Sequence, residues 1–272
     1  MCSREELLSS LRNPRVQAAR KLLRRAHRER ERAFLIEGPV MILEALASDA
    51  PLREIFVAPD APHAQEVMDS ARSKNVTVHP VTASVAAALS DTVTTQGAIA
   101  VADIPDRSLA EIGAGPSLVL VLADVRDPGN AGTLIRSAVA SGADAVVFCQ
   151  GAVDPFNPKT VRAAAGSVFR GHIVSGVSLA DAAEQLRAWG LVLLGADARA
   201  GKSAFDTDLG RPLAFVVGNE AWGMTDEARA AVDEVVGIPM PGGVESLNAG
   251  IAGSILLFEA VRQRGAGLSS SS

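Results

Sequence analysis

The sequence predicts an α/β fold in which a domain with a parallel sheet follows a smaller α/β domain. Short runs of Val, Leu and Ile without polar alternation recur along the chain, as in strands that helices cover on both faces. Segments with helical spacing of apolar residues separate these runs, and this alternation is typical of βαβ units. The chain has 272 residues, 48% of them hydrophobic, so it is long enough for two domains.

The first domain opens with helical segments. Ser3 and Glu6, in the stretch SREE, match a capping box and predict the start of a helix. The arginine-rich residues 13–32 either continue this helix after Pro14 or form a second one. Strands and helices then alternate. The predicted strands are 33–38, 53–58, 76–81 and 96–103, and the predicted helices are 40–48, 62–73 and 84–90.

Residues 104–116 are rich in turn formers and predict a linker between the domains. We therefore expect a first domain at 1–103, a second at 117–264 and a disordered tail at 265–272. The predicted strands of the second domain are 117–125, 143–149, 172–177, 191–197, 213–219 and 235–240. Its predicted helices are 131 onward, 158–166, 179–190, 225–234 and 246 onward.

The net charge of -5 conceals a basic N-terminal region. Residues 1–36 hold 10 Lys or Arg against 4 Asp or Glu, a charge of +6, so the remainder carries -11. Clustered arginine favours an anionic partner such as nucleic acid, with Arg20, Arg24 and Arg25 as candidate contacts. The alternative is a solvated helix face, because Arg makes up 22 of the 26 basic residues of the whole chain, a bias that codon usage can produce.

The cysteine count and the hydropathy pattern exclude several classes of protein. Cys2 and Cys149 are the two cysteines, and no Cys/His cluster has zinc spacing, so we predict neither a disulfide nor a structural metal. No stretch approaches the roughly 18 apolar residues of a membrane helix. We expect a cytoplasmic protein without membrane association.

The loop after the strand at 117–125 carries DPGNAGTLIRSA, residues 127–138. Ligands of parallel α/β sheets bind at the carboxyl ends of strands, where such loops enter helices. Asn130 is a candidate N-cap, and Arg136 should extend back about 6 Å over Gly132 toward Asn130, since helical side chains lean toward the N-terminus. This pattern favours a functional arginine, and the alternative is a surface arginine beside an ordinary cap.

Two further loops of this kind are FVVGNEAWGM, residues 215–224, and GIPMPGGVESLNAGIAGSILLFEAV, residues 237–261. In the second, Ser246 is a candidate N-cap for a helix. The predicted apolar seam of this helix is Leu247, Ile251, Ile255 and Phe258, and its first turns hold the small residues Ala249, Gly250, Ala252 and Gly253. Each glycine costs a helix about 1 kcal/mol, so these small residues indicate either a ligand close by or tight packing against another helix, including one across a dimer.

Competing nucleotide-binding motifs are missing from the sequence. The chain lacks the GxxxxGK[ST] pattern of P-loops and the GxGxxG pattern of dinucleotide-binding folds. A dinucleotide oxidoreductase is therefore disfavoured.

Together the three loops resemble the motifs of the SpoU/TrmH-type RNA ribose methyltransferases of the SPOUT superfamily. The matching stretches are DPGNAGTLIRSAVASGADAVVF, VVGNEAWGM and IPMPGGVESLNAGIAGSILLFE. The earlier NPRVQAARKLL, AFLIEG and TTQGAIAV resemble the N-terminal substrate-binding domain that many of these enzymes carry, including ribosomal RNA and thiostrepton-resistance methyltransferases.

The resemblance implies methyl transfer from S-adenosylmethionine to a ribose 2′-hydroxyl of RNA, with ribosomal RNA favoured over transfer RNA. It also implies a C-terminal trefoil knot and a homodimer whose subunits complete each other's sites. The cofactor residues that it implies are Gly218, Ile238, Met240, Leu247 and Ala196. The residues implied around the reacting hydroxyl are Asn130, Arg136, Glu220, Ser246 and Asn248.

In this family the arginine matching Arg136 is proposed as a general base. A guanidinium is effectively always protonated, so we favour a cation that donates hydrogen bonds to phosphate and to the developing alkoxide. Arg162 and Arg170 are candidates for contact with RNA or with the partner subunit's site, and simple surface exposure is the alternative. Because the chain has no Tyr and only 4% aromatic residues, we expect RNA shape and phosphates to dominate recognition over base stacking.

The chain departs from the family pattern after GNE, where Ala221 and Trp222 stand in place of the usual second glycine. An alanine at a position that needs positive φ costs about 1 kcal/mol or shifts the loop. A second hypothesis is therefore an RNA-binding relative that has lost catalysis through Ala221.

Overall fold

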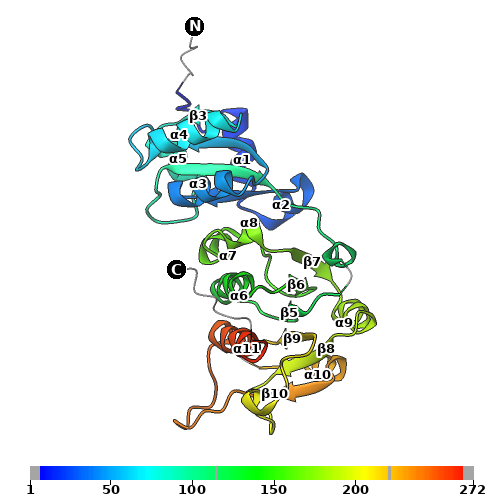
Figure 1. Cartoon of the computed structure of the whole chain (residues 1–272). Helices are drawn as coiled ribbons and strands as arrows, with labels where there is room; N and C mark the ends of the chain where they lie inside the picture. The colour runs from blue at the N-terminus through cyan, green and yellow to red at the C-terminus, as the bar shows by residue number, and fades with distance from the viewer. Residues whose placement is uncertain (1–6, 114, 220–221, 266–272) are drawn as a thin grey trace. The chain divides into compact units, whose positions relative to one another are not determined.

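The computed structural model describes residues 7–113, 115–219 and 222–265 of the chain. The predicted capping box at Ser3 and Glu6 and all but the first residue of the predicted tail lie outside these residues. Two compact units make up the chain (Figure 1). The first comprises Met1–Asp106 and Phe156–Phe169, and the second comprises Arg107–Pro155 and Arg170–Ser272.

The first unit is built on a four-stranded mixed sheet with the order β1-β4-β2-β3. Its strands are β1 (Ala33–Glu37), β2 (Leu52–Val57), β3 (Thr77–Pro80) and β4 (Ala98–Asp103). Strand β4 runs antiparallel to both of its neighbours, whereas β2 and β3 are parallel. Its first five helices are α1 (Pro14–Lys21), α2 (Arg25–Glu31), α3 (Pro39–Ala47), α4 (Ala64–Ser73) and α5 (Ala83–Leu89).

The arginine-rich segment forms two short helices rather than one. Helix α1 ends at Lys21, and Arg24 adopts an extended conformation at the N-cap of α2. The buried guanidinium of Arg28 donates a hydrogen bond to the carbonyl of Leu22 at 2.7 Å, which satisfies one carbonyl that the break frees. Val16, Ala19 and Leu22 face the core of the unit, so apart from Arg28 the basic side chains of this segment are exposed.

A segment from within the predicted second domain groups with the first unit. Helix α7 (Pro158–Ala163) and the start of α8 (Ser167–Arg170) belong to this segment, in place of the single helix predicted at 158–166. Phe156 packs against Phe34 with ring centroids 5.0 Å apart, and Arg162 forms ion pairs with Asp91 and, at 3.5 Å, with Glu37. Periodicity could not reveal this grouping, because it depends on contacts between residues far apart in the sequence.

The second unit contains a six-stranded sheet with the order β10-β8-β9-β5-β6-β7, in which every pairing is parallel. Its strands are β5 (Leu118–Leu122), β6 (Ala145–Cys149), β7 (Ile173–Val177), β8 (Val192–Ala196), β9 (Leu213–Val217) and β10 (Glu234–Val236). The prediction of an α/β fold with a parallel sheet is confirmed, and each of the ten predicted strands is present within a few residues of its expected bounds.

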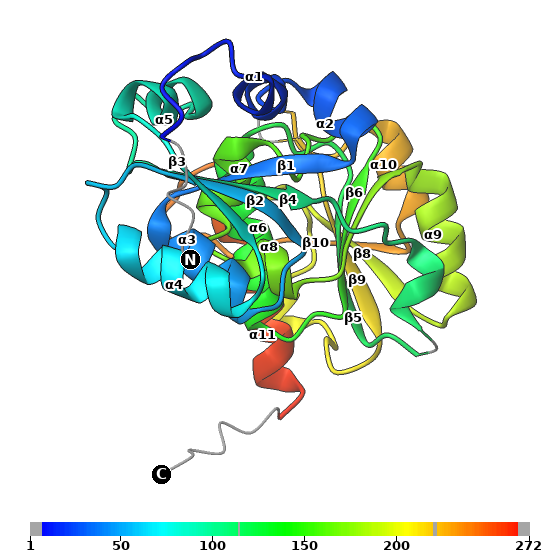
Figure 2. The ribbon, with the colours of Figure 1, turned by 90° about the horizontal axis from the view of Figure 1, so that it is seen from above.

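Helices cover both faces of this sheet (Figure 2). One face carries α9 (Leu179–Ala188) and α10 (Asp226–Ala231), and the other carries α6 (Pro128–Ala140) and α11 (Ala249–Gln263). Two short 3-10 helices, η1 (Leu109–Ile112) and η2 (Ala204–Asp206), lie in connections. Alternate residues of β5 therefore face opposite helix layers, which explains why all five are buried and why the strand shows no polar alternation.

Among the described residues, every helix falls short of the length and apolarity needed to cross a bilayer. Within the same residues, no group of His, Cys, Asp and Glu side chains has the arrangement of a metal site. Cys149 is buried in β6, and desolvation raises the pKa of its thiol to about 12.

The predicted apolar seam of the last helix is not the face that is buried within the chain. Ile251 and Phe258 are about half exposed, and the buried face of α11 instead consists of Gly250, Gly253, Leu256, Leu257 and Ala260. This face packs against α6, where Ser137 and Ser254 share a hydrogen bond at 2.7 Å. A Cβ added at Gly253 would lie 2.3 Å from Cδ2 of Leu134, which is fully buried. Gly250 and Gly253 thus serve tight helix packing, one of the two alternatives that the sequence left open.

We predict that Gly253→Ala destabilises the protein, although alanine normally favours a helix by about 1 kcal/mol over glycine. The added methyl group overpacks the contact with Leu134, at a cost of about 1–3 kcal/mol. Denaturant unfolding of Gly253→Ala, of Leu134→Ala and of the double variant measures the free energy of unfolding of each. The two costs should not add, because Leu134→Ala vacates the space that the new methyl needs. Additive costs would contradict the contact.

Candidate active site

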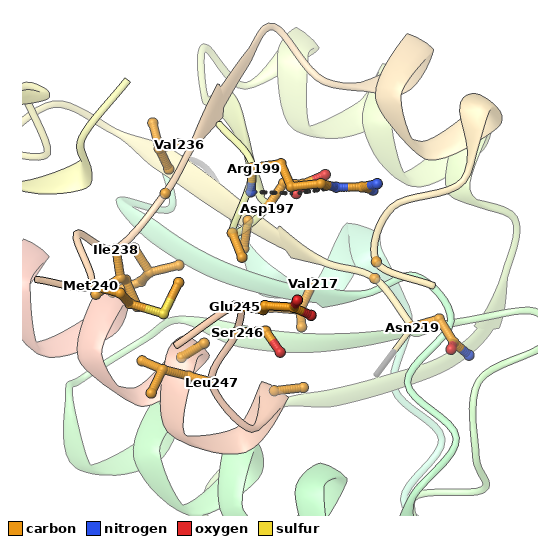
Figure 3. Close-up of a pocket in the computed structure, with 18 of the residues that line it drawn as sticks. Asp197, Arg199, Val217, Asn219, Val236, Ile238, Met240, Glu245, Ser246 and Leu247 are labelled. Atoms are coloured by element: carbon orange, nitrogen blue, oxygen red, sulfur yellow. Dashed lines mark hydrogen bonds and ion pairs between the residues drawn. The ribbon is translucent and has the colours of Figure 1, made fainter. Parts of the chain in front are cut away.

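A cavity of about 590 Å³ opens at the carboxyl ends of three neighbouring strands of the second unit (Figure 3). The loops that follow β8, β9 and β10 line it, together with residues 245–247 and the first turns of α11. A volume of this size is typical of small-molecule sites, and the carboxyl edge of a parallel sheet is where such folds bind ligands.

Predicted cofactor residues converge on this cavity. All five of Gly218, Ile238, Met240, Leu247 and Ala196 line it. Ser246, predicted near the reacting hydroxyl, lines it too. Figure 3 shows Ile238 and Met240 together on one side of the cavity, with Ser246 and Leu247 below its centre. The five positions come from three separate loops, so only the tertiary structure brings them together.

The loop after β9 closes into a tight turn. The backbone N–H and carbonyl of Asn219 bond to those of Gly223 in both directions, at 2.8 and 2.9 Å. A Cβ at Gly218 would lie only 2.5 Å from the carbonyl oxygen of Gly223, so the site requires glycine at position 218. Gly223 has a φ of 72°, which also favours glycine. The backbone of this turn therefore forms part of the cavity wall.

Asp197 is a buried carboxylate at the cavity, and the sequence analysis missed it. Its side chain is 4% exposed, and it pairs with Arg229 of α10 and, at 3.5 Å, with Arg199. Its Oδ1 also accepts a hydrogen bond from the backbone N–H of Arg199 at 2.8 Å. A carboxylate is costly to bury without such partners, so this cluster fixes the loop after β8.

The same residue ties the loop to the neighbouring strand. The N–H of Asp197 donates to the carbonyl of Val236 at 3.1 Å, at the end of β10. Asp197 directly follows the predicted cofactor residue Ala196 at a strand end, and this position was the signal that could have identified it. Arg199, Asn219 and Glu245 are further polar lining residues that the sequence reasoning did not select.

The first and third motifs meet through two asparagines. The side-chain amide of Asn248 donates to Oδ1 of Asn130 at 2.8 Å. Both predicted helix caps, however, are wrong. Asp127, not Asn130, caps α6 by accepting from the N–H of Asn130 at 2.8 Å, and Asn248, not Ser246, caps α11. Because helix α6 begins earlier than expected, Asn130 lies in its first turn, and its side chain accepts the hydrogen bond from Asn248.

Arg136 is not among the residues that line the cavity. It is exposed on α6, and its guanidinium forms neither a hydrogen bond nor an ion pair with any residue that the structure describes. Gly132, one turn earlier, is buried. Within one chain, Asn130 therefore contacts the third motif, whereas the guanidinium of Arg136 lies at the surface without a described partner. Glu220 and Ala221 lie outside the described residues.

The candidate RNA-binding arginines fall into different environments. Arg20 and Arg24 are exposed and have no ion-pair partner within the described part of the chain. Arg25 pairs with Glu29 at 2.7 Å on the surface of α2. Arg162 is committed to the ion pairs with Asp91 and Glu37, whereas Arg170 is exposed at the end of α8.

Family models match both units. Residues 117–258 match the SpoU rRNA Methylase family, and residues 13–100 match the MRM3-like substrate binding domain. The first match includes all the loops that line the cavity.

Similar proteins are named as ribosomal RNA methyltransferases. The chain is 32% identical to the 23S rRNA (guanosine(2553)-2'-O)-methyltransferase RlmP of Bacillus subtilis, over 92% of this chain and 97% of that protein. It is 34% identical to the 23S rRNA (guanosine-2'-O-)-methyltransferase RlmB of Xanthomonas axonopodis, over 84% of this chain and 96% of the relative.

Solved structures agree with this likeness. The SpoU methyltransferase AviRb of Streptomyces viridochromogenes in complex with the cofactor AdoMet has a TM-score of 0.84 and 32% identity, covering 94% of this chain and 100% of that one. The AdoMet-bound rRNA methyltransferase of Sinorhizobium meliloti has a TM-score of 0.83 and 29% identity, with 94% and 97% covered. On the family match, the sequence identity and the shared fold, the chain belongs to the SpoU rRNA methylase family.

Proposed function

We propose that the chain is an S-adenosylmethionine-dependent methyltransferase that modifies a ribose 2′-hydroxyl of ribosomal RNA. The observation that carries this proposal is the convergence of all five expected cofactor residues on one cavity. The relatives named above act on 23S rRNA, and two of the similar structures were solved with AdoMet.

The lining of the cavity fits S-adenosylmethionine. The apolar surface of the cavity, which suits an adenine ring and the aliphatic part of the methionine chain, comes from Val217, Ile238, Met240, Leu247 and Leu256. Asp197, Arg199 and Glu245 offer charges of both signs, which suit a ligand that carries both an ammonium and a carboxylate. Gly218 and Gly223 line the same space, so the ligand meets backbone at these two positions.

The bound cofactor supplies an already activated methyl group. The protein must then hold the ribose oxygen in line with that methyl and stabilise the charge that develops as the proton leaves. We place the ribose near Ser246 and the hydrogen-bonded pair of Asn130 and Asn248, which lie where the first and third motifs meet.

We assign Arg136 the role of a cation rather than a base. A guanidinium offers only N–H donors, so Arg136 can donate hydrogen bonds to an RNA phosphate and to the nascent alkoxide. A side chain that is exposed and has no partner in its own described chain is available for such a role.

We further propose that Arg136 acts in a homodimer, toward the cavity of the partner subunit. Arg136 does not line the cavity of its own chain. The outer face of α11 presents Ile251 and Phe258, which are 51% and 48% exposed, and α11 packs beside the helix that carries Arg136. Burial of this apolar face in a symmetric interface would place two copies of α6 next to each other's sites.

The trefoil knot that the resemblance implies is also part of the proposal. The segment between β10 and α11 shares the cavity with the loops after β8 and β9, and α11 then packs against the much earlier α6. These contacts between late and early segments of the second unit support this part of the proposal.

We propose that the first unit binds the RNA backbone through α1 and α2. Arg20 and Arg24 are exposed without ion-pair partners among the described residues, so they are available to phosphates. Arg170 stays a candidate for RNA contact. Arg162 is a weaker one, since contact with RNA would compete with its ion pairs to Asp91 and Glu37.

Arg136→Ala should lower the rate of methyl transfer at saturating RNA by at least about 100-fold, the scale of one lost transition-state donor. Cofactor affinity should persist, because Arg136 does not line the cavity. Transfer of labelled methyl groups to 23S rRNA transcribed in vitro, together with calorimetry of the cofactor, provides the measurements. Near-normal turnover would remove Arg136 from the mechanism.

A mixed dimer tests whether Arg136 acts across the interface. Co-expressed Arg136→Ala and Gly218→Val chains should regain up to about a quarter of wild-type activity, since half the dimers then hold one intact composite site. If Arg136 serves its own cavity, the mixture stays as inactive as either variant alone.

Reversal of Arg20, Arg24 and Arg25 to Glu should weaken RNA binding and flatten its dependence on salt, because fewer counterions are released. Filter binding at several salt concentrations measures the slope. Reversal of Arg72, an exposed arginine on α4, is the matched control and should leave the slope unchanged. An unaltered slope in the triple variant would favour the solvated-face alternative.

Asp197→Asn and Arg229→Ala should each weaken binding of S-adenosylmethionine by at least about tenfold, about 1.4 kcal/mol. The first removes the charge that holds the loop after β8, and the second leaves a buried carboxylate without its main partner. Arg262→Ala, which breaks an ion pair with Glu259 outside the cavity, is the control. Wild-type affinity in calorimetry of Asp197→Asn would contradict this role.

A further inference from the structure

Trp222 is a large aromatic side chain in an unusual position. It lines the cofactor cavity, yet it is 82% exposed. The chain has only two Trp, eight Phe and no Tyr, and the other tryptophan, Trp189, packs partly buried against the core of the second unit. Aromatic side chains usually bury their large apolar surface, so an indole left open at the rim of a site calls for an explanation.

The backbone around Trp222 is held on both sides. Its N–H donates to Oδ1 of Asn219 at 3.3 Å, and Nδ2 of the same asparagine donates to Oδ2 of Asp124 at 3.1 Å. The next residue, Gly223, closes the turn through its two hydrogen bonds to Asn219, and Met224 is buried. Trp222 and Gly223 are thus both tied to Asn219 through their backbones, which lowers the entropy cost of binding a ligand on the indole.

From this geometry we propose that Trp222 is a stacking platform for one nucleobase of the RNA, at the mouth of the cofactor cavity. The inference rests on the proposed function, since it presumes an RNA substrate. A ribose that reaches the cavity carries its base one glycosidic bond away, so a flat aromatic surface at the rim is placed to receive that base. Enzymes that recognise RNA commonly stack splayed bases on aromatic side chains.

The exposure of Trp222 favours a base of the RNA over the adenine of the cofactor. Inside the cavity, Val217 and Leu256 are 5% and 1% exposed and already supply buried apolar surface. The indole instead offers most of its surface to the outside. Stacking tolerates any base, because every base has a π face. One such contact adds to the recognition of RNA phosphates and RNA shape. The low aromatic content of the chain predicts this kind of recognition for the rest of its RNA-binding surface.

The first experiment uses Trp222 as its own probe. In a Trp189→Phe background it is the single tryptophan, and its fluorescence reports what lies on the indole. Addition of 23S rRNA transcribed in vitro should quench the emission, whereas S-adenosylmethionine alone should leave it nearly unchanged. Quenching by the cofactor alone would assign the ring to the adenine and overturn the proposal.

The second experiment compares substitutions by steady-state methyl transfer. Trp222→Ala should raise the KM for 23S rRNA by about tenfold, at the level of one lost stacked base, with the affinity for S-adenosylmethionine unchanged. Trp222→Phe should restore part of the affinity for RNA, and Trp222→Leu, which is apolar but has no ring, should not. Equal behaviour of the Phe and Leu variants would overturn stacking.

Two further outcomes are distinguishable. A Trp222→Ala variant that becomes monomeric in light scattering would mean that the indole contacts a second copy of the chain, which overturns the proposal. If the wild-type protein transfers no methyl group to RNA, the proposed function itself fails. If the wild type is active and Trp222→Ala matches it in KM for RNA, the inference about Trp222 alone fails.

Discussion

The close packing of α11 against α6 is the constraint on which the rest of the site depends. Gly253 brings the helices so near that even a methyl group would collide with Leu134, and the pair of Ser137 and Ser254 adds a polar contact between them. Only at this separation does the N-terminus of α11 lie beside that of α6, where Asn248 can donate to Asn130. The first and third motifs, more than a hundred residues apart, thus become one surface.

The cavity itself is shaped mainly by backbone and by one buried charge. Gly218 and Gly223 allow two backbone segments to approach more closely than side chains would permit. Asp197 anchors the loop after β8 to α10 and to the end of β10, at the cost of a buried carboxylate that Arg229 offsets. A site built in this way presents fixed backbone groups to a ligand, which suits a cofactor held largely by its polar edges.

The side chains proposed to contact RNA differ from those that shape the cavity, because they are exposed. Arg136, Arg20, Arg24 and Trp222 are exposed and are not tied to described neighbours through their charged or aromatic groups. The cofactor side of the site is therefore preorganised within one chain, whereas the RNA side is left open for a substrate and, as we propose, for a second subunit.

The sequence by itself determined the local elements and the chemistry of the loops. Strands such as β5 and β9 were predictable because five consecutive buried residues require an apolar run. The residues expected to hold the cofactor could be named because three stretches of the sequence each resemble a family motif, and the structure brings them to one cavity. The tertiary structure decided what depends on long-range contacts. Periodicity could not show which face of α11 is buried, because Gly250 and Gly253 carry no apolar side chain yet form the packed face. It likewise could not place Asp197, whose role arises only when Arg229 folds over it, nor group Phe156 and Arg162 with the first unit, because these contacts join distant parts of the chain.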